Sequence, residues 1–247
     1  MSDGPRLVQA FDSVDSTNER ALALAAAGAP DGSVIVAGEQ TAGRGRRGRA
    51  WHSPEGGLYL SYIVRDIASL PRPAMLTMAA GVATARAIQA VTGFDVRLKW
   101  PNDVLAPGAA LKLAGILAEA SSVGSRLEFV IIGIGINVSL ASVPRELQAT
   151  ASSLEGELGR AVDRAALQDA LIRSLDAEIA RLRSGGHDGM LRDWSALSPG
   201  ARDHAVSWRA DDVVLRGMTA GVDEDGALLV RTADGLQRLV AGEVVWA

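Results

Sequence analysis

Apolar and polar positions along the first two thirds of the chain follow either the spacing of a helix or the alternation of a strand. Residues 74–91 are apolar on all sides and predict a buried helix. Short connections between the later strands favour a mixed, mostly antiparallel sheet with helices on one side, and hence an α+β fold. Apolar runs or strict alternation predict strands over residues 33–37, 58–64, 95–100, 104–105, 111–119 and 127–138.

Further helices are indicated by their first residues. Ser16, followed three positions later by Glu19, is typical of a capping box that opens an alanine-rich helix. Asp163 precedes an apolar stripe at helical spacing over residues 167–182, which predicts an amphipathic helix. A shorter helix is expected over residues 190–197.

The pattern changes after residue 200. Short apolar runs are split by the turn signals Asp225-Gly226 and Asp234-Gly235, and strands at this spacing predict a small SH3-like barrel. Ser198-Pro199-Gly200 is a natural linker. We therefore expect a large domain over residues 1–199 and a small C-terminal domain over residues 200–247.

Composition excludes several classes of protein. The 25 basic and 29 acidic residues give a net charge of −4, so no global field favours nucleic acid or an anionic membrane. Cysteine is absent, which excludes disulfides, thiolate metal sites and an enzyme-bound thioester. The three histidines lack ligand spacing, so no protein metal site is expected. Without a signal core or a long apolar run near residue 1 or elsewhere, the protein is expected to be cytoplasmic.

The most unusual stretch is GRGRRGR at residues 43–49. Glycines allow the backbone to approach a ligand closely, and arginine forks match carboxylates and phosphates. The glycines fit the GxGxxG dinucleotide fingerprint, but that motif needs a helix directly after it, and here residues 51–57 predict a turn. We expect a cationic clamp for a phosphorylated or carboxylated small molecule. A basic patch for nucleic acid and a merely solvated loop are the alternatives.

Lysine is rare in a chain rich in arginine. Only Lys99 and Lys112 occur, in the motif-like stretches LKWPND and LKLAGIL, where a compact point charge is suited to a specific role. Gln40 follows a predicted strand, and its amide can both donate to and accept from an amide or ureido group. Gly133 and Gly135 interrupt another strand and indicate close backbone approach or a bulge.

Four stretches stand in one order and together resemble the biotin–protein ligases, also called biotin–acetyl-CoA-carboxylase ligases. The resemblance covers about residues 12–140, and the tail is similar to that family's C-terminal domain. It implies a central sheet related to class II aminoacyl-tRNA synthetases and lipoate ligases. Ser16 lies too near the start for the helix-turn-helix of repressor members, so the monofunctional type is expected. The stretches are STN at 16–18, QTAGRGRRGR at 40–49, KWPND with KLAGIL at 99–117, and GIGIN at 133–137.

The resemblance implies a reaction in two steps. The carboxylate of biotin attacks the α-phosphate of ATP, assisted by Mg2+, and the biotinyl-adenylate then meets a lysine amine on a biotin carboxyl carrier protein, such as that of acetyl-CoA carboxylase. Positioned cations, rather than an enzyme nucleophile, stabilise the charge. Neither DNA nor a membrane is expected as a partner, and the protein is a monomer or a homodimer. The alternatives are a lipoate–protein ligase and a non-catalytic biotin-sensing or nucleic-acid-binding module.

The resemblance also implies the catalytic residues. Lys112 is placed between the carboxylate of biotin and the α-phosphate. Arg44 and Arg46 close over the carboxylate and phosphate, and Gly43 and Gly45 belong to the same binding loop. For the neighbouring Arg47, a ligand contact and simple solvation are both open.

The remaining implied binding residues are polar, aromatic or small. They divide between the biotin ring, the nucleotide and places where the backbone must approach the ligand. The set comprises Ser16, Thr17 and Gln40 for the biotin ring; Asn18 as a further binding residue beside them in sequence; Arg49 and Trp51 nearer the adenylate; Lys99, Asn102 and Asn137 for the nucleotide; Gly115 and Gly133 for backbone approach; and Asp103, which would orient Lys112 or the incoming lysine.

Overall fold

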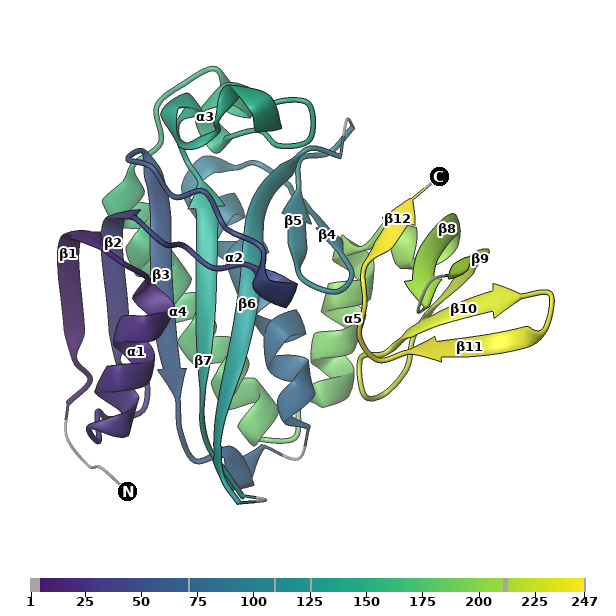
Figure 1. Ribbon diagram of the computed structural model, residues 1–247, viewed down its shortest axis with the longest axis horizontal. Helices are drawn as coiled ribbons and strands as arrows, with labels where there is room; N and C mark the ends of the chain where they lie inside the picture. The colour runs from purple at the N-terminus through teal and green to yellow at the C-terminus, as the bar shows by residue number, and fades with distance from the viewer. Residues whose placement is uncertain (1–4, 71, 109, 125, 211–212, 247) are drawn as a thin grey trace.

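A seven-stranded sheet forms the centre of the molecule (Figure 1). The computed structural model describes residues 5–70, 72–108, 110–124, 126–210 and 213–246. The strand order is β1-β2-β3-β7-β6-β5-β4; β1 and β2 are parallel, and the other neighbouring pairs are antiparallel. The predicted mixed, mostly antiparallel sheet is confirmed. Its strands are β1 (Val8–Val14), β2 (Val34–Gln40), β3 (Gly57–Val64), β4 (Arg97–Lys99), β5 (Asp103–Leu105), β6 (Lys112–Val123) and β7 (Arg126–Asn137).

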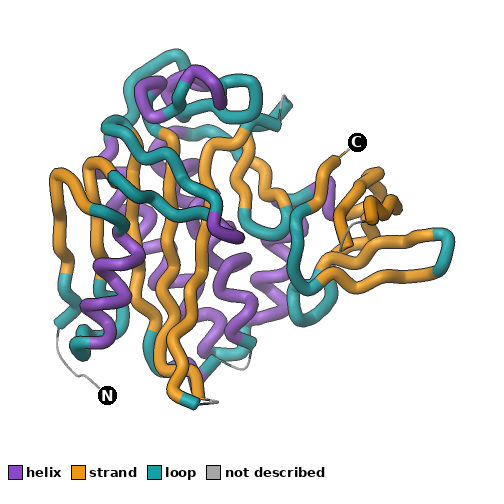
Figure 2. Tube along the Cα trace, in the orientation of Figure 1, coloured by secondary structure: helices purple, strands orange, loops and turns teal. Residues whose placement is uncertain are grey.

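Helices cover the two faces of this sheet unequally (Figures 1 and 2). One face packs against α2 (Leu76–Thr92), α4 (Arg164–Arg183) and α5 (His187–Leu197), while α1 (Thr17–Ala26) packs against the opposite face. The expectation of helices on one side only is therefore wrong. The short helix α3 (Leu154–Leu158) lies beyond one end of the sheet.

Alternation along the strands explains both layers. Val34, Val36 and Val64 point into the large apolar cluster beneath α2 and α4. Their neighbours Ile35 and Ile63 point the other way, into a small cluster with the alanines of α1. Because successive side chains of a strand face opposite sides, a strand buried on both faces reads as a continuous apolar run. The helix α1 is short and covers only part of its face, so the rest of that face is left open for a site.

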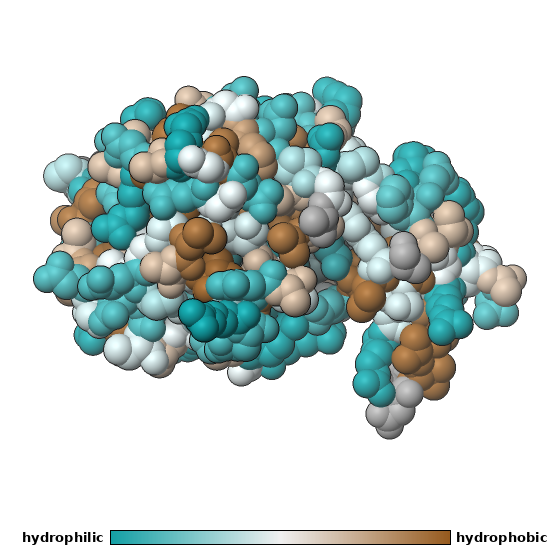
Figure 3. Space-filling model, turned by 90° about the horizontal axis from the view of Figure 1, so that it is seen from above, coloured by the Kyte–Doolittle hydropathy of each residue, from teal (hydrophilic) through white to brown (hydrophobic). Residues whose placement is uncertain are grey.

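The C-terminal strands form a second, five-stranded antiparallel sheet with the order β11-β10-β9-β8-β12. These short antiparallel strands agree with the expected SH3-like domain. The sheet projects from the main body as a smaller lobe (Figure 3). Its apolar core is continuous with that of the larger unit, and Trp100 Nε1 donates a 3.0 Å hydrogen bond to the Gly226 carbonyl. The strands are β8 (Arg202–Ala210), β9 (Val213–Val222), β10 (Leu228–Thr232), β11 (Gly235–Leu239) and β12 (Val244–Trp246).

The expected domain division is compatible with these elements but stays a prediction. The first strand of the second sheet begins at Arg202, just after the proposed linker. The outermost parts of both predicted domains, residues 1–4 and 247, lie outside the described residues. In the part of the chain that the structure describes, no helix combines the length and apolar character that a membrane crossing requires.

Local signals at the helix starts were partly misleading. Asp163 caps α4 as expected, because its carboxylate accepts the Ala166 N–H at 3.0 Å. Ser16 does occupy the N-cap of α1, but its side chain makes no capping hydrogen bond, so the predicted capping box is wrong. Glu19 instead forms an ion pair with Arg44 of the arginine loop, and the Ser16 N–H, which Glu19 would accept in a capping box, donates to Asp15 Oδ1 at 2.8 Å.

Candidate active site

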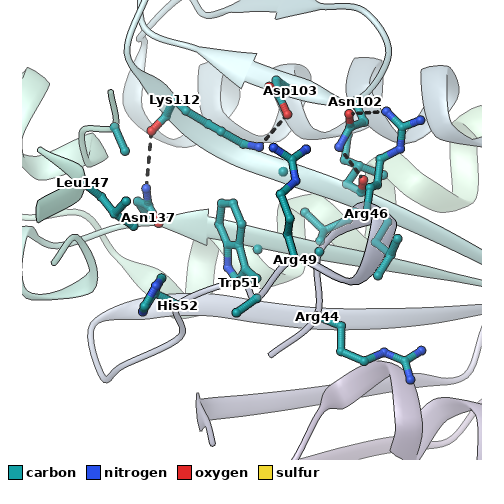
Figure 4. A pocket seen from close by; sticks show the side chains of 18 of the residues that line it. Arg44, Arg46, Arg49, Trp51, His52, Asn102, Asp103, Lys112, Asn137 and Leu147 are labelled. Carbon is teal, nitrogen blue, oxygen red and sulfur yellow. Dashed lines mark hydrogen bonds and ion pairs between the residues drawn. The ribbon is translucent and has the colours of Figure 1, made fainter. Parts of the chain in front are cut away.

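A cavity of about 680 Å³ lies on the open part of the sheet face, beside the start of α1 (Figure 4). The arginine loop, residues 43–49, and residues 142–151 contribute to its walls. This volume is within the range of small-molecule sites, about 300–1,000 Å³. All of the site residues predicted from the sequence, except Gly43, line this one cavity. The structure therefore brings them together, and their individual roles stay predictions.

Gly43 lies behind the cavity wall. A Cβ atom at this position would overlap the Trp51 carbonyl oxygen and the Ser53 hydroxyl. The Gly43 carbonyl accepts the Trp51 N–H at 2.9 Å, which joins the two arms of the arginine loop. Glycine is required here because the loop arms approach closely, and its contribution to binding is indirect.

The floor of the cavity consists largely of glycine. Gly115 and Gly135 are cross-strand partners on β6 and β7, and the indole of Trp51 lies against both of them. A Cβ on Gly115 would be 3.0 Å from the ring, and one on Gly135 would overlap Nε1. Among the described residues, Trp51 Nε1 is buried without a hydrogen-bond partner. The sequence analysis noted Gly135 in the GIGIN stretch but did not place it at the site.

Lys112 and Asp103 form an ion pair inside the cavity. Lys112 Nζ lies 2.6 Å from Asp103 Oδ1 and 5.2 Å from the centre of the Trp51 ring. A cation over an indole face is stabilised by the ring quadrupole. The ammonium group is thus held between a carboxylate and an aromatic face, as required of a positioned point charge (Figure 4).

Arg44 is held towards α1 and away from Lys112 (Figure 4). Its guanidinium forms ion pairs with Glu19 of α1 and Glu119 of β6. Glu119 was not predicted from the sequence, although it stands two residues after the KLAGIL stretch, at a position that alternation places on the same face as Gly115. Two carboxylates balance Arg44, so an anionic ligand would have to compete with them.

Two other loop arginines contact the C-terminal lobe. Arg46 Nη1 donates to Asn102 Oδ1 at 3.0 Å and to the Gly242 carbonyl at 3.1 Å, and Arg49 lies 3.1 Å from Glu243. Burial, followed by repulsion from a neighbouring arginine, lowers the pKa of Arg46 below its ordinary value. A bound anion would relieve this unfavourable field. Gly242 and Glu243 could not be predicted as neighbours of the loop because they are far from it along the chain.

The polar end of the cavity is a set of interlocked side chains. The Thr17 N–H donates to Gln40 Oε1 at 2.8 Å, and Gln40 Nε2 donates to Ser53 Oγ at 2.7 Å. Asn18 Nδ2 donates to Glu119 at 2.6 Å. Each amide nitrogen retains a second hydrogen that these bonds do not use. This end of the cavity is suited to a ligand head group with hydrogen-bonding capacity.

The other predicted residues support the cavity walls. Asn137 Nδ2 donates to the Ser152 carbonyl at 3.0 Å and so fixes the wall beyond β7. Lys99 Nζ lies 5.4 Å from the Trp246 ring, which places a cation between the two lobes. Across the described ranges, no group of three or more His, Cys, Asp or Glu side chains is arranged to hold a metal ion.

Comparison with known proteins decides the family. The model of the biotin/lipoate A/B protein ligase family matches residues 10–137, and that of the biotin protein ligase C-terminal domain matches residues 206–246. The chain belongs to the biotin/lipoate protein ligase family. The resemblance inferred from the four sequence stretches is thereby confirmed, together with the fold class.

Relatives of this ligase family match over nearly the whole chain. The biotin–[acetyl-CoA-carboxylase] ligase of Mycobacterium tuberculosis is 37% identical over 250 residues, which cover 98% of this chain and 90% of that protein. The Paracoccus denitrificans enzyme of the same name is 35% identical, with coverage of 93% and 96%. The biotin protein ligase of Aquifex aeolicus in complex with biotin and ATP superimposes with a TM-score of 0.85 at 27% identity, covering 98% of this chain and 99% of that chain.

Proposed function

We propose that this ligase activates biotin with ATP and transfers it to a lysine of a carrier protein, the biotin carboxyl carrier domain of acetyl-CoA carboxylase. The observation that carries the proposal is the arrangement of one cavity. The polar end, the Lys112–Asp103 pair and the arginine loop all line this cavity. Similarity to relatives named for biotin and for acetyl-CoA carboxylase supports the same substrates.

The arrangement explains the first step. A biotin carboxylate oxygen attacks the α-phosphorus of ATP while the bond to the β-phosphate breaks and pyrophosphate leaves. Negative charge increases on the α-phosphate oxygens, and a fixed cation near them lowers the barrier. Lys112 is held beside the cavity centre by Asp103, and Arg46 reaches the same cavity from the loop. In the second step, the carrier amine attacks the acyl carbon and AMP leaves.

Mg2+ fits this scheme as a companion of ATP. The ion usually keeps several waters and binds through one or two carboxylates together with substrate phosphates, rather than in an all-protein cage. The described residues offer no such cage, and Asp103 and Glu243 are the carboxylates that line the cavity. When bound, Mg2+ would neutralise phosphate charge.

Lipoate is the competing acid within the family. Its dithiolane ring has no strong hydrogen-bonding group, whereas biotin carries a ureido group. An apolar ring would leave the second N–H of the Asn18 and Gln40 amides without a partner, and unpaired buried polar groups are costly. This observation favours biotin.

The test is ATP–pyrophosphate exchange with each acid, followed by transfer to a carrier domain. Biotin is expected to support exchange, and lipoate at equal concentration is not. Mass spectrometry of the carrier should then show a mass increase of one biotinyl group on a single lysine. Exchange supported by lipoate alone, or no exchange with either acid, would overturn the proposal.

A further inference from the structure

Ser61 is a fully buried hydroxyl at the centre of β3, with 0% exposure. Its neighbours Leu60 and Tyr62 face the large helical layer, so Ser61 faces the side of the cavity. Its cross-strand partner is Gly133 of β7. A Cβ on Gly133 would overlap the amide of Asn18, so that amide occupies a seat formed by the Gly133 backbone and the Ser61 hydroxyl.

The available protons determine the direction of the hydrogen bonds around the Asn18 amide and the Ser61 hydroxyl. The Glu119 carboxylate, paired with Arg44, only accepts, so the Asn18 nitrogen must face it and the Asn18 oxygen must face Ser61. Ser61 Oγ lies 2.6 Å from Asn18 Oδ1 and 2.8 Å from Thr17 Oγ1. A hydroxyl has one proton and the Asn18 oxygen can only accept, so Ser61 donates to Asn18, while the Thr17 proton has two acceptors within reach, Ser61 Oγ and Gln40 Oε1.

The Gln40 amide lies on the far side of the polar end, and its hydrogen bonds also fix its orientation. Gln40 Oε1 accepts the Thr17 N–H at 2.8 Å and has a second lone pair for the Thr17 hydroxyl, which lies 3.0 Å away. Gln40 must therefore direct its nitrogen to Ser53, which in turn donates to the Trp51 carbonyl at 3.0 Å. The amides of Asn18 and Gln40 are thus each held in one orientation, with one spare N–H on each.

We propose that Ser61 is a positioning residue for the ring-binding end of the cavity: its single proton fixes the Asn18 amide in the orientation that a cyclic urea requires, and its oxygen packs against the Thr17 hydroxyl. Ser61 does not line the cavity and acts through these two side chains. The inference rests on the proposed function, because it identifies the group that gives the polar end its selectivity for a hydrogen-bonding ring.

The test measures KM for biotin, KM for ATP and kcat in pyrophosphate exchange for Ser61→Ala. Removal of the hydroxyl leaves the buried Asn18 oxygen without a donor, and KM for biotin is expected to rise about tenfold. KM for ATP and kcat should stay within about twofold, because the phosphate-binding residues are untouched. Ser61→Thr, which retains a hydroxyl in a strand position, is expected to stay near the wild-type KM.

A matched control and a double variant separate positioning from a general loss of packing. Ser33→Ala removes the same atom from another fully buried serine, whose hydroxyl accepts only the Leu7 N–H among the described residues. It should leave KM for biotin unchanged. In an Asn18→Ala background, Ser61→Ala should add less than about twofold, because its partner is gone.

Three results would overturn the inference: an unchanged KM for biotin in folded Ser61→Ala, an equal rise in KM for ATP, or fully additive effects in the double variant. Absence of biotin-dependent exchange in the wild-type protein is a different result, and it would count against the proposed function itself.

Discussion

The indole of Trp51 rests directly on the backbone of Gly135, in space that any side chain at position 135 would occupy. The contact buries the indole N–H without a hydrogen-bond partner among the described residues. Glycine at this position of β7 is therefore a requirement of the loop that crosses it. The same contact sets where the arginine loop lies above the sheet.

Gly135→Ala is expected to displace Trp51 and to weaken both folding and binding. Overpacking of a buried contact costs about 1–3 kcal/mol, and KM for ATP should rise with the shift of the loop. Denaturant unfolding and exchange kinetics measure the two effects. In a Trp51→Ala background, the added methyl should cost little stability, because the indole that it would displace is absent.

A glycine in the helical layer provides the control for this change. A Cβ on Gly81 of α2 would meet Leu98 at 3.5 Å, which is ordinary contact. Gly81→Ala should therefore be tolerated, and the gain in helix propensity favours the variant. Equal destabilisation by Gly81→Ala and Gly135→Ala would contradict the role given to the Trp51 contact.

Lys112→Arg keeps the charge but changes its shape. The guanidinium is planar and larger than the ammonium that fits between Asp103 and the Trp51 ring, so it cannot occupy the same point. Pyrophosphate exchange is expected to fall about 100-fold, the scale of losing one positioned donor. Lys99→Arg is the comparison, because its cation lies over Trp246 and arginine stacks equally well on an aromatic ring. Similar losses in both variants would contradict a specific role for Lys112.

Arg46→Gly should loosen the retention of the adenylate. Arg46 joins the loop to Asn102 and to the Gly242 carbonyl, and these contacts close the cavity beside its centre. Without them, released biotinyl-adenylate should label lysines other than the carrier's. Mass spectrometry of a mixture of carrier and an unrelated protein measures this spread.

Arg47→Gly is a matched control within the same loop. Arg47 is exposed, does not line the cavity, and has a backbone φ of +56°, which glycine adopts without strain. Biotinylation by this variant should stay confined to the carrier. If an active Arg46→Gly enzyme labelled only the carrier, that result would contradict the role of the arginine loop in retaining the adenylate.

Stability towards acid is expected to depend on Asp193 of α5. A hydrogen bond from Arg181, supported by Arg86, holds the pKa of Asp193 below its ordinary value. Since the folded pKa is below the unfolded value of about 3.9, this contribution is complete above that pH and is lost as the pH falls through the folded pKa. In urea unfolding, Asp193→Asn should therefore differ from wild type at pH 7 and converge with it in acid. A difference between Asp193→Asn and wild type that is the same at pH 7 and in acid would contradict this assignment.

Much of the fold could be predicted because its strands are buried on both faces. Strands were predicted correctly at β3 and β6, and their antiparallel arrangement follows from short connections. The strand β1 was missed because it lies at the sheet edge, with every residue except Val14 exposed, and an exposed edge strand carries little periodic signal. The position of α1 was missed because its small apolar face of alanines resembles that of a solvated helix.

The site was predictable where its chemistry is contiguous in sequence. The charge and the spacing of the arginine loop and the lysine motifs can be read directly from the sequence, and the structure brings these stretches to one cavity. Glu119, Gly135 and Glu243 were missed because their importance depends on what lies opposite them after folding. A carboxylate or a glycine in a strand is ordinary until tertiary contacts place an arginine or an indole beside it.

The contacts of Arg46 with Gly242 and of Arg49 with Glu243 place the last strand of the chain beside the mouth of the cavity. Any affinity tag or fluorescent fusion added after β12 would emerge near the arginine loop. Kinetic work on this protein should therefore carry its tag at the other terminus, or remove it before measurement. Conversely, a reporter dye attached near residue 243 would sense opening of the loop directly.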